Sequence, residues 1–116
     1  MFIRSATLTD VGTLADLHCE FRDSLQKVTP TREQFHETLL KVLQQSGTRA
    51  LVAYVDGEAA GYVTLQARLT AWASTNTAVL EDLYVRPSFR GRGIGRLLCQ
   101  RSVKVYQGGR FKMYHL

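Results

Sequence analysis

The order of hydrophobic and polar residues in the first half of the chain predicts one strand followed by two helices. Residues 2–6 alternate apolar and polar side chains, as expected for a strand. After a cap at Thr9 or Asp10, apolar residues recur every three or four positions up to about residue 21, which predicts a helix. A second helix begins at Thr31, which forms a capping-box pair with Gln34. The apolar faces of the two helices contain Val11, Leu14, Leu17 and Phe21, and Phe35, Leu39, Val42 and Leu43.

The second half of the chain predicts three strands, a helix and a last strand. Residues 49–55 and 59–69 form two strands joined by Asp56-Gly57, a pair that tight hairpin turns favour. A further strand covers 77–85 and is stopped by Pro87. A loop rich in arginine and glycine then opens a helix, and RFKMYHL at the end of the chain is a final strand. The order β-α-α-β-β-β-α-β predicts an α+β or mixed α/β fold, with one parallel strand pair joined by a right-handed crossover.

The amino-acid composition indicates the number of domains and the cellular compartment, which the hydrophobic pattern does not. The 116 residues suffice for one domain with a single core, and a hydrophobic content of 45% with 22% charged residues is ordinary for a globular protein. The longest purely apolar run, residues 50–55, is too short to cross a bilayer, and the start lacks the apolar core of a secretory signal. Cys19 and Cys99 show neither a CxxC spacing nor a metal-ligand spacing. We therefore expect one cytoplasmic domain over residues 1–116, without membrane contact, disulfide or metal.

Charge is distributed unevenly along the chain. Residues 1–82 contain seven Lys and Arg and all ten acidic residues, a net charge of −3, whereas residues 83–116 contain eight Lys and Arg and no acid. A basic third of this kind indicates contact with a polyanion, although a solvated basic face would have the same composition.

The stretch RPSFRGRGIGR, residues 86–96, concentrates this charge around three glycines. It lacks the GK[ST] of a P-loop, and Arg96 stands where a dinucleotide fingerprint needs its third glycine. A strand, a flexible loop and a helix start are nevertheless enough for an anion site, because the first N–H groups of a helix are unpaired and the helix dipole is positive there. The loop alone is equally compatible with a glycine-rich turn carrying surface arginines.

The strand before the loop favours an anion site over a simple glycine-rich turn. The stretch VLEDLYVRPSFRGRGIGRLL, residues 79–98, resembles motif A of the GNAT acyltransferase superfamily. The family signature, Q/R-x-x-G-x-G/A, is matched by Arg90, Gly91, Arg92, Gly93, Ile94 and Gly95. The order of elements also resembles the GNAT fold from its first strand to its fifth. Within the superfamily, residues 80–95 are most similar to the diamine and polyamine (spermidine/spermine) and thialysine acetyltransferases, which share the Leu-Glu-Asp-Leu run.

The resemblance implies an N-acetyltransferase with acetyl-coenzyme A (acetyl-CoA) as co-substrate and no metal. The backbone of Leu83, Tyr84 and Val85 would pair with the pantetheine arm, and an N–H at the splayed end of this strand would polarise the thioester carbonyl. The pyrophosphate would be held by the segment Arg90, Gly91, Arg92, Gly93, Ile94, Gly95 and Arg96. The acceptor is expected to be a small-molecule amine, most simply a small cation.

The acceptor amine must lose a proton before it attacks a thioester. An alkyl ammonium has a pKa of about 10.4, so its neutral form costs roughly 4–5 kcal/mol at pH 7, part of which a general base recovers. Glu81 matches the catalytic glutamate of the family, and Asp82 is a supporting group expected on the other face of the strand. Without the resemblance, Glu81 would be interpreted as a solvated or paired strand carboxylate. His18, His36 and His115 have no spacing of a triad or ligand set and are expected at the surface or sheet edge.

The sequence leaves two other functions open, and it also predicts a shortened fold. The chain could be a non-catalytic CoA-binding remnant or a basic nucleic-acid-binding module. Against the second, the basic third has no obvious row of exposed aromatic residues, and its glycines have the spacing of a strand-to-helix loop. The family's acid tyrosine lies on a later helix than this sequence contains, and neither Tyr106 nor Tyr114 matches it. The domain therefore resembles a GNAT fold truncated after its fifth strand, whose free edge would favour a homodimer.

Overall fold

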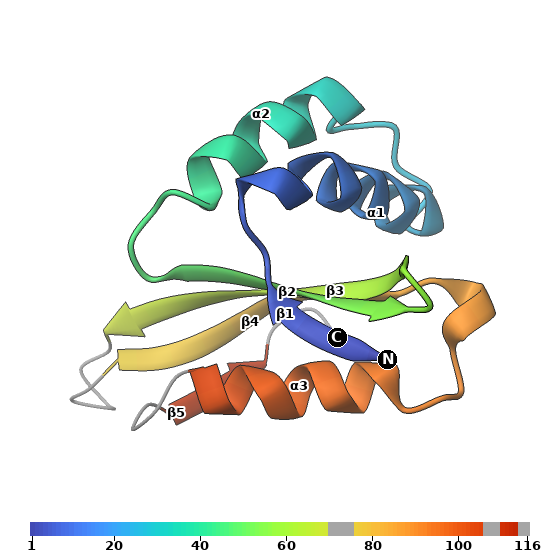
Figure 1. Cartoon of the computed structure of the whole chain (residues 1–116). Coiled ribbons are helices and arrows are strands. Elements are labelled where there is room, and N and C mark those ends of the chain that lie inside the picture. The colour runs from blue at the N-terminus through green and yellow to red at the C-terminus, as the bar shows by residue number, and fades with distance from the viewer. Residues whose placement is uncertain (70–75, 106–109, 114–116) are drawn as a thin grey trace.

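The computed structural model describes residues 1–69, 76–105 and 110–113, and within them a five-stranded sheet forms the middle of the molecule (Figure 1). Its strands are β1 (Phe2–Ser5), β2 (Thr48–Val55), β3 (Glu58–Leu69), β4 (Asn76–Val85) and β5 (Arg110–Met113). They lie in sequence order across the sheet. The pairs from β1 to β4 are antiparallel, and β4 and β5 are parallel.

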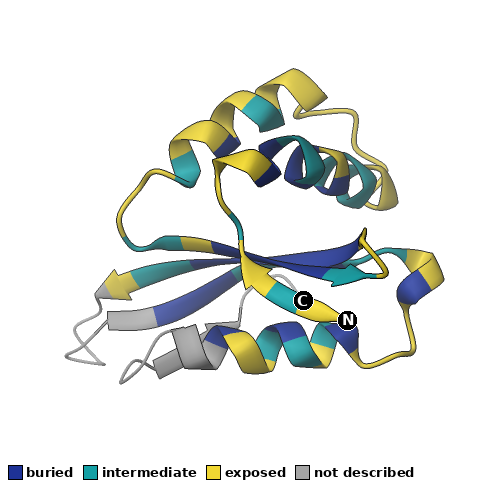
Figure 2. Ribbon diagram, in the orientation of Figure 1, coloured by how far each residue is buried: buried dark blue, intermediate teal, exposed yellow. Residues whose placement is uncertain are grey.

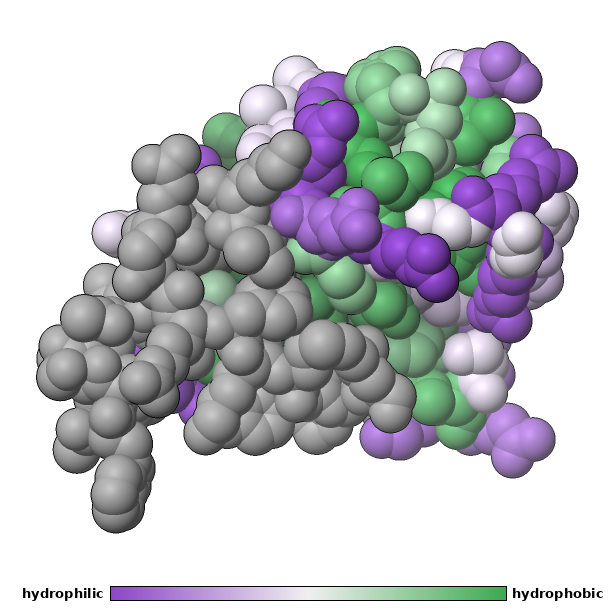
Figure 3. Space-filling view, turned by 90° about the horizontal axis from the view of Figure 1, so that it is seen from below, coloured by the Kyte–Doolittle hydropathy of each residue, from purple (hydrophilic) through white to green (hydrophobic). Residues whose placement is uncertain are grey.

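Helices cover both faces of the sheet. The helices α1 (Val11–Ser24) and α2 (Arg32–Val42) lie together on one face, and α3 (Ile94–Val105) lies on the other, as Figure 1 shows. Seen from the side of α3, hydrophilic side chains run between groups of hydrophobic ones (Figure 3). None of the described helices combines the length and the apolar character needed to cross a membrane.

Apolar side chains on the two faces of the sheet form two core clusters. The first lies under α1 and α2 and contains Leu14, Leu17, Leu39, Val52 and Tyr62. The second lies under α3 and contains Leu51, Val63, Leu80, Ile94 and Leu98. Figure 2 shows the buried residues concentrated in the central strands and on the inner faces of the helices. The alternation along β2 and β3 thus supplies both clusters, because successive side chains of a strand point to opposite faces.

The element order that the sequence predicts is confirmed, with local differences at helix starts and ends. The first helix extends to Ser24, and Asp10 precedes it without capping it, because its carboxylate bonds to the Thr7 N–H and to Arg4. Thr31 and Gln34 do form the predicted capping box, with Gln34 N 3.2 Å from Thr31 Oγ1. The Asp56-Gly57 turn is also confirmed, since both residues have a positive φ, as a tight hairpin requires.

Candidate functional site

A β-bulge on β4 changes where its two acidic residues point. In the register with β3, Asp82 pairs with Thr64 and Leu80 pairs with Leu65, so Glu81 is an extra residue between the two pairs. The expectation that Glu81 and Asp82 lie on opposite faces of the strand is therefore wrong. Both residues line one cavity on the α1 and α2 side, because the bulge interrupts the regular alternation.

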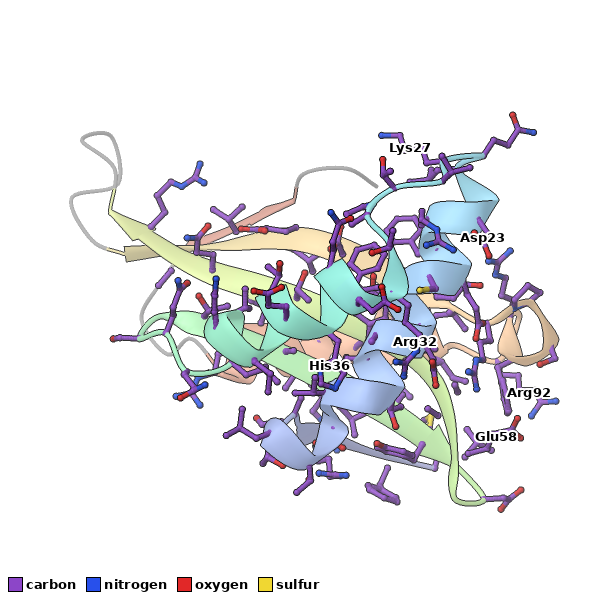
Figure 4. The ribbon with its side chains drawn as sticks, turned by 90° about the horizontal axis from the view of Figure 1, so that it is seen from above. Asp23, Lys27, Arg32, His36, Glu58 and Arg92 are labelled. Atoms are coloured by element: carbon purple, nitrogen blue, oxygen red, sulfur yellow. The ribbon has the colours of Figure 1, made fainter. Side chains whose placement is uncertain are left out.

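This cavity, called here the acidic cavity, has a volume of about 330 Å³ and lies between α2 and the sheet. Its residues come from α1, α2, the segments flanking α2, and strands β2 to β4. They are His18, Pro30, Gln34, Phe35, Thr38, Leu39, Val42, Gln45, Thr48, Thr64, Leu65, Gln66, Glu81 and Asp82. Arg32 fastens the start of α2 to α1 through a 2.8 Å bond from its Nε to Asp16 Oδ1, and Figure 4 shows it between the two helices.

His18 is part of this wall, so the expectation that it lies at the surface or an edge is wrong. Its side chain is 11% exposed, and its ring stacks on Tyr62 with the centroids 4.3 Å apart. Nδ1 lies 2.7 Å from the Leu14 carbonyl oxygen, which can only accept, so Nδ1 carries the hydrogen and Nε2 faces Asp82 Oδ2 at 3.9 Å. Burial lowers the pKa of His18, against the opposing effects of the Leu14 carbonyl and Asp82. A neutral imidazole thus lies beside the two carboxylates.

Tyr62 lies beneath His18 and is fully buried. Its hydroxyl has no hydrogen-bond partner within the described part of the chain, and burial raises its pKa. The Asp82 carboxylate also accepts from the Thr64 hydroxyl at 3.4 Å. In the wall of the acidic cavity, Asp82 thus lies next to the Thr64 hydroxyl and to His18, whose ring stacks on the buried Tyr62.

A second hollow lies where β4 passes into the loop before α3, and it is called here the glycine-loop hollow. It measures about 480 Å³ and is lined by Phe21, Ser24, Leu83, Tyr84, Val85, Phe89, Arg90, Gly91, Gly93, Ile94 and Gly95. The parallel ladder with β5 ends at Leu80 and Met113, so within the described residues the next stretch of β4, 81–85, has no strand on that side. Leu83, Tyr84 and Val85 of this stretch line the hollow.

The loop exposes backbone at the start of α3. Gly91 and Gly93 have φ of +81° and +79°, and a Cβ built on either would meet nothing within 4 Å. The first helical bond of α3 joins Leu97 N to Gly93 O at 3.0 Å, so the N–H groups ahead of Leu97 belong to the unpaired first turn. The glycines thus serve a left-handed backbone that opens toward the hollow, as an anion cradle requires.

The four arginines of the loop have different surroundings. Arg86 forms a fork on Glu20 of α1, with Nη2 2.7 Å from Oε2, and Nη1 donates to the Ala59 carbonyl at 2.9 Å. Arg90 donates from Nε to the Val85 carbonyl at 2.8 Å, and Arg92 lies over the Phe89 ring. Arg92 and Arg96 are exposed, and Figure 4 shows Arg92 projecting from the edge of the molecule. Arg86 is therefore a structural residue, and the other three arginines carry the exposed charge of the loop.

The structure brings most of the expected residues to one segment of β4 and the loop after it. Glu81 and Asp82 line the acidic cavity, and nearly all of the expected donor-binding residues line the glycine-loop hollow. Arg92 and Arg96 do not line it within the described chain. His18 is the residue that the sequence analysis missed, since a helical histidine four residues after Leu14 carries no motif. Tyr106, Tyr114 and His115 lie outside the described residues, among which no group of three or more potential ligands could hold a metal.

Comparisons with known proteins agree on one family. The model of the acetyltransferase (GNAT) family matches residues 13–116. An uncharacterized N-acetyltransferase of Archaeoglobus fulgidus is 29% identical over 109 residues, which are 90% of this chain and 72% of that protein.

Solved structures share the fold at lower identity. An integron cassette protein from the mobile metagenome of Cole Harbour Salt Marsh superposes with a TM-score of 0.90 at 22% identity, covering 98% of this chain and 76% of that one. Aminoglycoside N-acetyltransferase AAC(6')-Iy, solved in complex with CoA, superposes with a TM-score of 0.84 at 19% identity, covering 99% and 76%.

Proposed function

Because the chain belongs to the GNAT family of acetyltransferases, we propose that it transfers the acetyl group of acetyl-CoA to a primary amine, and that this amine is a small cation. The observation that carries the proposal is that the two hollows border adjacent parts of one short segment of β4, residues 81–85. Glu81 and Asp82 line the acidic cavity, whereas Leu83 to Val85 line the glycine-loop hollow. A donor and an acceptor bound in the two hollows would meet along this short segment.

The glycine-loop hollow is proposed to bind the donor. Side chains of Leu83 and Val85 pack into the core under α3, so this part of β4 offers a ligand its backbone, which an extended pantetheine arm can pair with. Gly91 and Gly93 leave room for a pyrophosphate next to the N–H groups that open α3. Exposed Arg92 and Arg96, with Arg90, add attraction for the phosphates. Bound acetyl-CoA supplies the activated acetyl thioester.

The acidic cavity is proposed to bind and deprotonate the acceptor. Glu81 and Asp82 would attract an ammonium, and the Glu81 carboxylate would take its proton as the amine nitrogen bonds to the acetyl carbon. The bond from that carbon to the CoA sulfur breaks, and the sulfur leaves as a thiolate that is protonated to the thiol. Asp82, held by Thr64 and facing His18, keeps a second negative charge beside the ammonium. Backbone N–H groups of β4 would polarise the thioester carbonyl.

The solved structure in complex with CoA is named an aminoglycoside N-acetyltransferase, and this supports an amine as the acceptor. The alternative of a basic nucleic-acid-binding module is less favoured, because the Arg86 guanidinium is held by Glu20 and by the Ala59 carbonyl. The alternative of a CoA-binding remnant predicts donor binding without turnover.

One pair of measurements separates these possibilities. Isothermal titration with acetyl-CoA, followed by a thiol-release assay across primary amines, should show both binding and amine-dependent release of CoA. Binding without release under any amine would favour the remnant. Salt-sensitive binding to oligonucleotides without any binding of acetyl-CoA would favour the nucleic-acid module.

Self-association stays a prediction. Within the described chain, β5 is the last strand of the sheet and pairs with β4 alone. A two-fold dimer that extends the sheet at this edge would double the mass measured by light scattering after size exclusion, and a monomer at micromolar concentration would contradict it.

A further inference from the structure

Most of the acidic side chains of this chain lie outside the acidic cavity. All ten acids lie within the described residues, and the stretches 70–75, 106–109 and 114–116 contain none. Four acids are bonded to arginines elsewhere: Asp10 to Arg4, Asp16 to Arg32, Glu20 to Arg86, and Asp23 to Arg22. Asp56 and Glu58 belong to the β2–β3 hairpin, and neither Glu33 nor Glu37 lines the cavity. Among the described residues, Glu81 and Asp82 are therefore the acidic side chains that line the cavity.

Those two carboxylates are neighbours on one strand, so the negative charge of the wall is at one place. The rest of the described wall, apart from neutral His18, is apolar or carries neutral amides and hydroxyls. Its apolar side chains are Pro30, Phe35, Leu39 and Val42, and its neutral polar ones are Gln34, Thr38, Gln45, Thr48, Thr64 and Gln66. The side chain of Leu65 belongs to the core cluster under α3. A long ligand in this cavity would therefore have one end beside the two carboxylates and the other end beside uncharged side chains.

From this distribution we infer that the acceptor is a primary monoamine with an uncharged, largely apolar tail, and not a diamine or polyamine. The inference rests on the proposed acetyltransferase function. The ammonium would lie against Glu81 and Asp82, and the tail would lie between α2 and β3, where apolar side chains of α2 remove it from water. A second ammonium on the tail would lose its hydrating water without forming an ion pair with a carboxylate, and this desolvation would make binding less favourable. The similarity of residues 80–95 to polyamine acetyltransferases would then reflect the donor site and the base, and not the acceptor.

A matched pair of substrates tests this inference directly. Hexylamine and 1,6-diaminohexane have the same carbon chain and differ by one terminal ammonium. In the thiol-release assay at saturating acetyl-CoA, kcat/KM for hexylamine should exceed that for the diamine about tenfold or more, a difference of about 1.4 kcal/mol. Spermidine should be poorer than hexylamine as well. An equal or higher kcat/KM for the diamine or spermidine would overturn the inference and leave the acetyltransferase proposal intact. No release with any amine would overturn both.

A carboxylate introduced into the uncharged part of the wall should make the cavity accept a diamine, and this gives a second test. Gln66 is half-buried and lies two residues beyond Thr64 on β3, roughly 7 Å along the strand. Gln66→Glu keeps the side-chain shape and would place a carboxylate where the second ammonium of a diamine lies. The ratio of kcat/KM for 1,6-diaminohexane over hexylamine should rise at least fivefold. Gln44→Glu adds the same charge at an exposed position outside the wall and should leave the ratio unchanged. A ratio that rises equally in both variants, or in neither, would contradict the inference.

Discussion

The two hollows beside β4 are built in different ways, and the difference shows which parts of this site a sequence can encode locally. The glycine-loop hollow is lined by Phe21, Ser24 and residues from a single stretch, 83–95. The acidic cavity is lined by residues spread from His18 to Asp82 on five elements and the segments between them. The first therefore depends on the backbone conformation of one continuous segment, and the second depends on side chains that only the packed fold brings together.

The two hollows also offer different chemical groups to a ligand: backbone groups in one and side chains in the other. The glycine-loop hollow offers N–H groups and conformational freedom, with Gly91 and Gly93 in the left-handed region. The acidic cavity offers two carboxylates and an imidazole whose pKa burial lowers. Substitutions should consequently separate donor affinity from turnover, and the separation can be measured.

The largest effect is expected in the acidic cavity. Glu81→Gln removes the base and retains the shape, so kcat with the best amine should fall about 100-fold or more, while the Kd for acetyl-CoA stays within about twofold. Stopped-flow or steady-state thiol release and calorimetry measure the two quantities. Glu37→Gln, an exposed change on α2, is the control. An unchanged kcat in the Glu81 variant would remove the base from the proposed mechanism.

The second effect is expected in the glycine-loop hollow. A methyl group at Gly93 would project into open space, where the proposed pyrophosphate would lie, so Gly93→Ala should weaken acetyl-CoA binding about tenfold and leave kcat at saturating donor near the parent value. Gly57→Ala is a matched control, since Gly57 has the same φ of +79° and equally open surroundings in a hairpin turn. Both variants bear the same backbone strain, roughly 1–2 kcal/mol. Equal donor affinity in the two variants would place the pyrophosphate elsewhere.

A third, smaller effect is expected at the link between the two regions. Arg86 joins the end of β4 to Glu20 of α1 by a fork that lysine cannot reproduce. Arg86→Lys should lower the free energy of unfolding by about 1 kcal/mol, because both side chains are partly exposed and solvent screens the pair. Urea denaturation measures the change. Arg32→Lys, in a more exposed pair with Asp16, should have a smaller effect, and a reversed order would contradict this account.

The smallest effect concerns the dependence of stability on pH. The folded pKa of His18 lies below its usual value, so between pH 6.5 and that lower pKa the unfolded chain binds the extra proton and the folded chain does not. The free energy of unfolding should therefore fall as pH drops below 6.5, by at most about 1.4 kcal/mol per pH unit from this residue.

The variant His18→Gln isolates this contribution. Urea titrations of parent and variant from pH 7 to pH 5 should show a shallower loss in the variant. His36→Gln controls for the loss of an imidazole outside the cavity wall. The same slope in the His18 variant as in the parent would show that the imidazole is not kept neutral by the fold.

Much of the architecture could be predicted from the sequence because it depends on local interactions. The periodicity of apolar residues determined the order of strands and helices, the Asp56-Gly57 pair determined the hairpin, and Thr31 with Gln34 determined the start of α2. Residues 90–95 similarly determined a loop with positive φ before a helix, since glycine is the residue that adopts this conformation at little cost.

The tertiary structure alone decided the acidic cavity. Strict alternation placed Glu81 and Asp82 on opposite faces of β4, but the register with β3 inserts a bulge at Glu81 and brings both to one cavity. The place of His18 in the wall and the pairing of Arg86 with Glu20 were equally hidden, because each joins residues 64 or more positions apart. Such contacts depend on how helices pack on a sheet, and the pattern of a single segment does not contain this information.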